Sequence, residues 1–151
     1  VFERQIHARV PRHLSPVGQM NWRWISKQAL MLLHGESLAT HGGREGMRDE
    51  GLLESALMRP QNTVAYADAD NPPDAAALAA GYGVGIAKNH PFVDGNKRAA
   101  FLAVGMFLYI NGMRLRASQA EATVTMLAVA AGDMPEDEFA AWLRVHSVAR
   151  A

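Results

Sequence analysis

Along most of the chain apolar residues recur three and four positions apart, the spacing that gathers them on one face of an α-helix. In the first such stretch, Ala29, Leu32 and Leu33 fall on one face. Strand–helix–strand repeats are absent from the sequence pattern, which excludes a Rossmann or P-loop enzyme. The pattern therefore predicts an all-α domain, with helices at about 22–40, 50–59, 75–88, 96–110, 118–131 and 135–146.

Local signals indicate where several of these helices begin and end. Ser118 followed by Glu121 is a capping box. Pro60 is expected to end the second helix, because proline lacks the N–H group that a helix interior needs. The segment 61–73 that follows is rich in Asn, Asp and Pro and is predicted to be a long surface loop or a small hairpin. Helix 96–110 is apolar almost all round, which predicts that it is central and buried.

The chain has 151 residues, a length that suits one domain with its own hydrophobic core. It contains no cysteine, which excludes a disulfide scaffold, a thiolate zinc site and a cysteine nucleophile. Its 15 Lys and Arg residues balance 15 Asp and Glu residues, so overall charge indicates neither a nucleic acid nor a membrane partner. No stretch is long and apolar enough to span a bilayer, and a cytoplasmic protein is expected.

The first clear helical pattern starts near Met20. Residues 1–19 contain arginines but no continuous apolar stretch of the kind found in a signal peptide. They are predicted to be a tail, either a fused segment or upstream sequence. Residues 20–151 are predicted to be the domain.

Polar residues concentrate in one short segment, 89–98, between two helices built mostly of Ala, Gly and Leu. The segment leads into the N-terminus of a buried helix, where unpaired N–H groups and a partial positive charge favour an anion. Gly95 lets the backbone approach a ligand closely, and Lys97 and Arg98 add two cations. Cations at a helix N-terminus are otherwise unfavourable, so this pair indicates a bound phosphate.

The same segment contains a candidate base and a hard oxygen ligand. The imidazole of His90 is suited to accept a proton. The carboxylate of Asp94 suits Mg²⁺, which takes one or two protein carboxylates together with phosphates and water. Taken singly, each of these residues also fits an ordinary solvated turn. Taken together with a phosphate cradle, they predict a phosphotransfer site.

The segment resembles the Fic-family motif His-x-Phe-x-Asp/Glu-Gly-Asn-Gly/Lys-Arg, and here it reads His90-Pro-Phe-Val-Asp94-Gly95-Asn96-Lys97-Arg98. Within the Fic/Doc superfamily the chain is most similar to the Doc (death on curing) toxins of toxin–antitoxin modules, over about residues 24–146. The resemblance implies a helical fold with the motif loop between two central helices and a small flap or loop insertion. It also implies that His90 is the base, Asp94 the Mg²⁺ ligand, and Gly95, Asn96 and Arg98 the phosphate cradle.

Two positions depart from the motif of those Fic enzymes that transfer AMP. Lys97 stands where they have a second glycine, and Phe101 stands where they have a second arginine. Both departures match the Doc toxins, which transfer the γ-phosphate of ATP to a threonine of elongation factor Tu and so stop protein synthesis. The resemblance thus implies a Mg²⁺- and ATP-dependent Ser/Thr kinase-type phosphotransferase, with Lys97 as a clamp on the phosphoryl group. AMP transfer to a protein hydroxyl and a non-catalytic interaction domain are the alternatives.

An inhibitory partner is also expected. Many Fic proteins restrain themselves with a Ser/Thr-x-x-x-Glu-Gly/Asn segment, which the sequence does not contain. A cognate antitoxin is therefore expected, whose disordered tail folds as a helix in an apolar groove. The apolar residues of the first helix are either exposed parts of that groove or part of the core: Trp22, Trp24 and Leu30.

The protein target is the second expected partner. Fic proteins hold a target segment against a flap beside the active site by strand-like pairing, a general way to bind an extended peptide. The β-leaning patch that the sequence offers for this role is Thr63, Val64, Ala65 and Tyr66. The alternative is an ordinary loop whose Tyr66 packs on the core.

Overall fold

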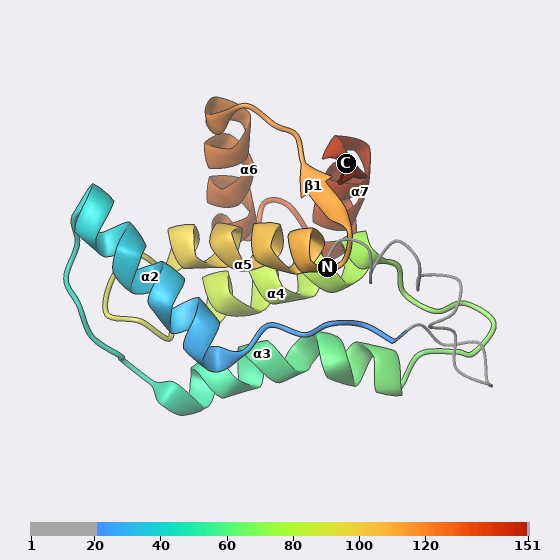
Figure 1. Ribbon diagram of the computed structural model, residues 1–151, viewed down its shortest axis with the longest axis horizontal. Coiled ribbons are helices and arrows are strands. Elements are labelled where there is room, and N and C mark those ends of the chain that lie inside the picture. The colour runs from blue at the N-terminus through green and yellow to red at the C-terminus, as the bar shows by residue number, and fades with distance from the viewer. Residues whose placement is uncertain (1–20, 151) are drawn as a thin grey trace.

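The computed structural model describes residues 21–150, so the predicted tail at 1–19 lies outside the described residues. Over this range the chain forms helices joined by short loops, with a small two-stranded sheet near the C-terminal end (Figure 1). The predicted all-α architecture is confirmed. In chain order the elements are α2 (Lys27–His41), α3 (Glu50–Ala65), α4 (Ala75–Asn89), α5 (Asn96–Ile110), β1 (Met113–Leu115), α6 (Gln119–Ala131), α7 (Glu136–His146) and β2 (Ser147–Ala149).

Helices α4 and α5 lie side by side at the centre of the molecule (Figure 1). Helix α3 and helix α7 pack against α4, and α2 packs against α5. The small residues of α4 allow this close approach: a Cβ built on Gly85 would lie 3.3 Å from the Cβ of Ala56 in α3. Among the described residues, no helix is long and apolar enough to cross a bilayer.

Several predicted helix boundaries are confirmed. Helix α5 begins and ends at the predicted residues. The capping box is present, since the Oγ of Ser118 accepts a hydrogen bond from the N–H of Glu121 and the Glu121 side chain accepts one from the N–H of Ser118.

The first predicted helix, which is α2, begins at Lys27 rather than at residue 22. The Oγ of Ser26 accepts a hydrogen bond from the N–H of Ala29 and caps the helix there.

The buried face of α2 differs from the predicted one. Leu30, His34 and Leu38 follow each other at intervals of four and face the interior, whereas Leu32 is 69% exposed. A histidine is tolerated on this face because its ring is stacked and hydrogen-bonded in the interior, which apolar periodicity alone does not indicate.

The residues proposed for an antitoxin groove belong to the core. Leu30 is completely buried. The rings of Trp22 and Trp24 pack against Phe107 of α5, with ring centroids 5.9 and 5.8 Å from its ring. Of the two alternatives, the core is therefore confirmed for Leu30, while Trp22 and Trp24 are partly buried and pack against that core.

Helix α3 continues past Pro60 to Ala65, so the predicted end at residue 59 is wrong. Pro60 is buried against α4, and its ring carbon Cγ lies 3.5 Å from where a Cβ on Gly81 would be. This packing compensates for the backbone hydrogen bond that a proline inside a helix forfeits.

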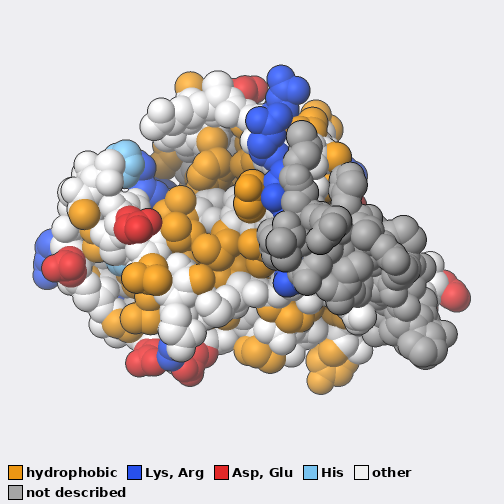
Figure 2. All heavy atoms as spheres, viewed as in Figure 1, with side chains coloured by type: hydrophobic (Ala, Val, Ile, Leu, Met, Phe, Trp, Pro, Cys, Tyr) orange, Lys and Arg blue, Asp and Glu red, His pale blue; other side chains and the backbone are white. Residues whose placement is uncertain are grey.

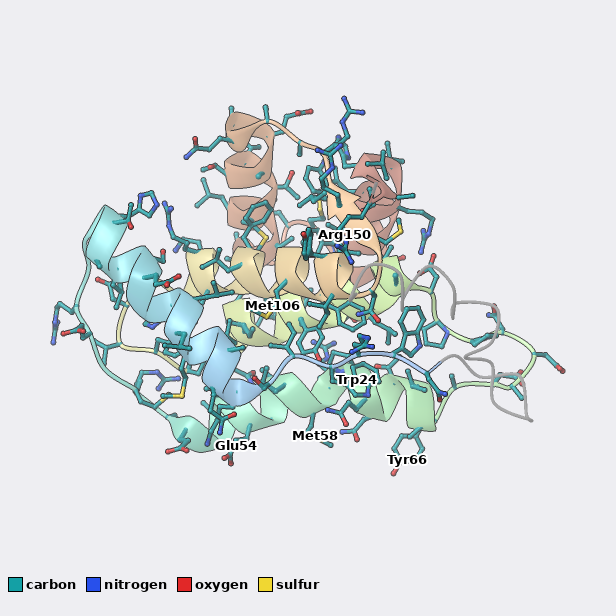
Figure 3. The ribbon with its side chains drawn as sticks, viewed as in Figure 1. Trp24, Glu54, Met58, Tyr66, Met106 and Arg150 are labelled. Atoms are coloured by element: carbon teal, nitrogen blue, oxygen red, sulfur yellow. The ribbon has the colours of Figure 1, made fainter. Side chains whose placement is uncertain are left out.

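The β-leaning patch is consequently helical rather than strand-like. Thr63, Val64 and Ala65 form the last turn of α3, and Tyr66 caps it by donating its N–H to the carbonyl oxygen of Asn62 at 3.0 Å. Tyr66 is 88% exposed and points away from the body of the molecule (Figure 3). Both predictions for this patch, a pairing flap and a loop whose Tyr66 packs on the core, are therefore wrong.

A short antiparallel sheet ties the C-terminal end of the described chain to the end of α5. Strands β1 and β2 pair with Met113 opposite Ala149 and Leu115 opposite Ser147. Each strand has three residues, too few for the alternating pattern by which a strand is identified from sequence.

The packing of α4 gives a stability prediction with a matched control. Gly83→Ala should lower the free energy of unfolding by about 1–3 kcal/mol, because its Cβ would lie 2.8 Å from Phe139 and 2.9 Å from Val104. In α5, a Cβ on Gly105 would have nothing within 4 Å, so Gly105→Ala should raise the free energy of unfolding by about 0.5–1 kcal/mol. Urea denaturation of both variants tests this. Equal shifts of the same sign would show that the packing at Gly83 is loose.

Candidate active site

The predicted chemical segment forms the turn between α4 and α5, at one end of the molecule. Residues 90–95 leave the C-terminus of α4 and enter the N-terminus of α5. Helix α2 ends at the same side, and the chain from its end to the start of α3 passes there as well (Figure 1). We refer to that connecting chain, residues 42–49, as the 42–49 loop, and to residues 90–95 as the motif loop.

His90 caps the C-terminus of α4 and is exposed to solvent. Its backbone is left-handed, with φ 50° and ψ 55°. On the inner side of the ring, the Nδ2 of Asn96 lies 3.4 Å from its Nδ1. The imidazole is therefore accessible to a substrate while one of its nitrogens faces a fixed amide.

Asn96, at the start of α5, is buried, and its side chain hydrogen-bonds the backbone of the motif loop. Its Oδ1 accepts a hydrogen bond from the N–H of Phe92 at 2.9 Å, and its Nδ2 donates to the carbonyl oxygen of Phe92 at 3.0 Å. These bonds fix which end of the amide faces His90. Of the residues predicted for the phosphate cradle, Asn96 is thus the one whose side chain is already occupied within the protein.

The carboxylate of Asp94 is exposed and points to the 42–49 loop. Its Oδ2 accepts a hydrogen bond from the backbone N–H of Arg44 at 3.1 Å, and its Oδ1 accepts one from that of Gly95 at 2.9 Å. These two bonds, that from Arg44 first, lower the pKa of Asp94 from its ordinary value of 3.8. Asp94 is therefore ionised at neutral pH.

This carboxylate fits a magnesium ion that is shared with a phosphate ligand. Each of its oxygens accepts one backbone hydrogen bond and keeps a further lone pair. Within residues 21–150, no three His, Asp or Glu side chains are grouped so that they could enclose a metal. An ion at Asp94 would therefore draw its other ligands from phosphate oxygens and water, as Mg²⁺ usually does.

The N-terminus of α5 presents positive charge to the same space. Gly95 caps the helix with φ 75° and, having no side chain, leaves the first N–H groups uncapped. Lys97 and Arg98 on the first turn are exposed, and in the described part of the chain neither has an ion-pair partner. The structure thus brings together every predicted residue of the motif, His90, Asp94, Gly95, Asn96, Lys97 and Arg98.

His34 belongs to the site although the sequence pattern did not indicate it. Its Nε2 donates to the carbonyl oxygen of Asp94 at 2.8 Å, and its ring stacks on that of Phe92 with centroids 3.7 Å apart. Glycine suits position 95 because its φ of 75° is one that a side chain disfavours, and a Cβ there would be in contact with the Nε2 of His34 and a methyl group of Leu38, both at 3.4 Å. The intervals of four between Leu30, His34 and Leu38 are the signal that could have found it.

The 42–49 loop was also missed, and it supplies the extended backbone that had been expected elsewhere. Met47 forms an antiparallel bridge with Phe92, and the N–H of Val93 donates to the carbonyl oxygen of Gly46 at 3.0 Å. Glycine suits the tight approach at Gly43, where a Cβ would lie 3.2 Å from the Oδ2 of Asp94. Extended chain therefore lies along the motif loop itself.

The predicted flap residues are not beside the motif loop. Thr63, Val64, Ala65 and Tyr66 lie at the far end of α3, roughly 20 Å along the helix from its start at the 42–49 loop. Thr63 and Tyr66 line a groove between α3 and α4 that reaches Asn89. His90 does not line that groove.

Comparison with known proteins agrees with this arrangement. The model of the Fic/DOC family matches residues 24–108. "Toxin Doc" of Mycolicibacterium smegmatis (strain ATCC 700084 / mc(2)155) is 47% identical over 76 residues, which are 50% of this chain and 57% of that protein. "Protein kinase doc" of Escherichia phage P1 is 35% identical over 122 residues, which are 81% of this chain and 94% of the phage protein.

The contact of His34 gives a prediction for the stability of the motif loop. His34→Phe keeps a ring beside Phe92 but leaves the carbonyl of Asp94 without its donor, which should lower the free energy of unfolding by about 1–3 kcal/mol. His41→Phe, at the exposed end of α2, should change it by less than about 0.5 kcal/mol. Chemical denaturation measures both, and equal midpoints for His34→Phe and the parent chain would contradict the role of this bond.

Proposed function

The chain belongs to the Fic/DOC family, and we propose that it is a toxin that transfers the γ-phosphoryl group of ATP to a Ser or Thr hydroxyl of a translation factor, elongation factor Tu. Phosphorylation of this factor would stop protein synthesis. The name of the phage relative, a protein kinase, supports transfer of phosphate. The chain spans only 57% of the mycobacterial toxin, so activity, substrate and partner are all part of the proposal.

The observation that carries the proposal is the position of Lys97 on the first turn of α5. Its exposed ammonium has no ion-pair partner in the described chain and stands where AMP-transferring members have a glycine. Phe101, one turn further, is packed against the core where those members have a second arginine. Positive charge is therefore concentrated at the helix entrance, which favours a terminal phosphoryl group there.

The roles of the other residues follow from their positions. His90 would accept the proton of the target hydroxyl while the hydroxyl oxygen bonds to the γ-phosphorus. The bond from that phosphorus to the bridging oxygen breaks, and ADP leaves. Asn96 holds the motif loop beside His90 through its two hydrogen bonds to Phe92. Lys97, Arg98 and the uncapped N–H groups of α5 bind the phosphoryl oxygens, and Gly95 leaves them room.

Magnesium fits this scheme as an ion held by Asp94 and by the phosphate oxygens of ATP. When bound it would neutralise phosphate charge. Asp94 is prepared for this by the hydrogen bonds that lower its pKa, and the N–H donors of Arg44 and Gly95 fix the orientation of its carboxylate.

The protein target would lie along the 42–49 loop. The loop pairs with the motif loop at Met47 and Phe92, and its residues 42–46 are exposed. An extended target segment added at this edge would bring a hydroxyl to His90. This replaces the flap predicted at residues 63–66.

A cognate antitoxin would inhibit the toxin by covering an apolar surface. Figure 2 shows hydrophobic side chains gathered in a hollow over α5, between α2 and α6. Exposed apolar residues on these helices include Leu32 of α2, Tyr109 of α5 and Val124 of α6. An amphipathic helix folding on binding suits such a surface.

Labelled ATP tests the reaction directly. Incubated with Mg²⁺ and elongation factor Tu, the chain should transfer label from the γ-position and not from the α-position. His90→Ala should lower the rate by about 10²–10⁴-fold, the usual contribution of a general base. Lys97→Gly should also slow transfer, whereas Lys88→Ala, which removes an exposed lysine outside the site, should not. Label from the α-position on the target would mean AMP transfer, the second candidate.

The magnesium role of Asp94 has its own test. Asp94→Asn should lower the rate and raise the Mg²⁺ concentration for half-maximal activity by roughly tenfold or more, since even residues that only support a metal ligand cost that much. Asp70→Asn, an exposed carboxylate in the connection from α3 to α4, is the control and should leave the Mg²⁺ titration unchanged. An unchanged titration in Asp94→Asn would assign the ion to another ligand.

A further inference from the structure

The end of helix α4 is held by an arginine that lies 42 residues earlier in the sequence. The Nε of Arg48 donates to the carbonyl oxygen of His90 at 2.6 Å, and its Nη2 donates to that of Asn89 at 2.7 Å. The last carbonyls of a helix lack partners within it and carry partial negative charge. A planar guanidinium with parallel N–H groups matches two adjacent carbonyls, which a single ammonium does not.

The backbone beside Arg48 binds the next carbonyl. The N–H of Arg48 and the N–H of Asp49 donate to the carbonyl oxygen of Pro91, at 2.8 and 3.0 Å. Three successive carbonyls, those of Asn89, His90 and Pro91, are thus all bound by one short stretch of the 42–49 loop. The peptide units on both sides of the His90 Cα are fixed in this way.

His90 needs such support because of its own backbone conformation. With φ 50° it is the one residue other than glycine that has a positive φ among residues 21–150. A side chain disfavours this conformation, and it persists where surrounding contacts determine it. The direction of the Cα–Cβ bond, and with it the position of the imidazole, depends on this conformation.

We propose that Arg48 is a positioning residue for His90: by binding the carbonyls of Asn89 and His90 it keeps the His90 backbone left-handed and holds the imidazole at the site. Arg48 acts through His90 and touches no reacting atom. Both bonds are exposed to solvent, so water replaces them when the side chain is removed. The loss is therefore one of geometry rather than of folding. The kinetic consequence rests on the proposed function; the structural one does not.

The kinetic test compares Arg48→Ala with a matched variant at the other end of α4. Arg144 binds both oxygens of Asp74, the N-cap of that helix, at 2.7 and 3.1 Å. Arg48→Ala should lower kcat by about 10–100-fold with KM for ATP unchanged, the size of effect that a misplaced catalytic group produces. Arg144→Ala should leave kcat unchanged.

Two further measurements distinguish the loss of His90 positioning from the mere loss of the positive charge of Arg48. Guanidinium ion added to Arg48→Ala should restore part of kcat, because it can rebuild the pair of bonds. Arg48→Lys keeps the positive charge but lacks the planar guanidinium, so its kcat should be lower than that of the parent chain. A kcat for Arg48→Lys equal to that of the parent, or a fall in Arg144→Ala as large as in Arg48→Ala, would overturn the proposal.

A spectroscopic measurement decides the proposal without any activity. In the parent chain the backbone chemical shifts and the H–N–C–H coupling of His90 should report a left-handed residue, and in Arg48→Ala they should move toward averaged values. Unchanged His90 signals in Arg48→Ala would overturn the positioning role. A parent chain that transfers no label, combined with the expected change in these signals, would overturn the proposed function and leave the positioning role supported.

Discussion

The hydrogen bonds that close the turn between α4 and α5 are the constraint on which the rest of the structure depends. A chain that leaves one buried helix and at once enters another has carbonyl and N–H groups that neither helix can pair. Here several of them are paired from three directions, by Asn96 within the turn, by His34 from α2 and by Arg48 from the 42–49 loop, while the first N–H groups of α5 stay uncapped. These bonds restrict the conformation of the turn and so position the side chains on it.

The close packing of α4 against its neighbours fixes the relative positions of the helices. Its glycines and alanines bring α3, α5 and α7 close enough that few adjustments are possible; a Cβ on Gly83 would meet Phe139 of α7 and Val104 of α5. Rigid placement of α4 and α5 fixes the end of one helix against the start of the other. A site made of exposed charges, which alone would be mobile, is thereby preorganised by a small-residue core.

Local signals in the sequence were enough for part of this structure. The bounds of α5 and the Ser118–Glu121 capping box depend on neighbouring residues, and the motif residues adjoin one another in the chain, so both could be predicted. The passage of α3 through Pro60 and the bonds that His34 and Arg48 make to the motif loop could not. His34 and Arg48 lie 60 and 42 residues from the groups they bind, and their roles exist only once the helices are packed.

The exposure of the site has a consequence for how it would work. His90, Asp94, Lys97 and Arg98 all face solvent, so the described residues 21–150 do not enclose them in a water-free pocket. Electrostatic interactions are weak in water and strengthen when it is excluded. The charges of this site would therefore reach full effect only when nucleotide and target segment cover them together. Under the proposed function, a site completed by its own substrates would favour transfer to a docked protein over transfer to water. It also makes control by a partner that changes the shape or access of this end of the molecule physically simple.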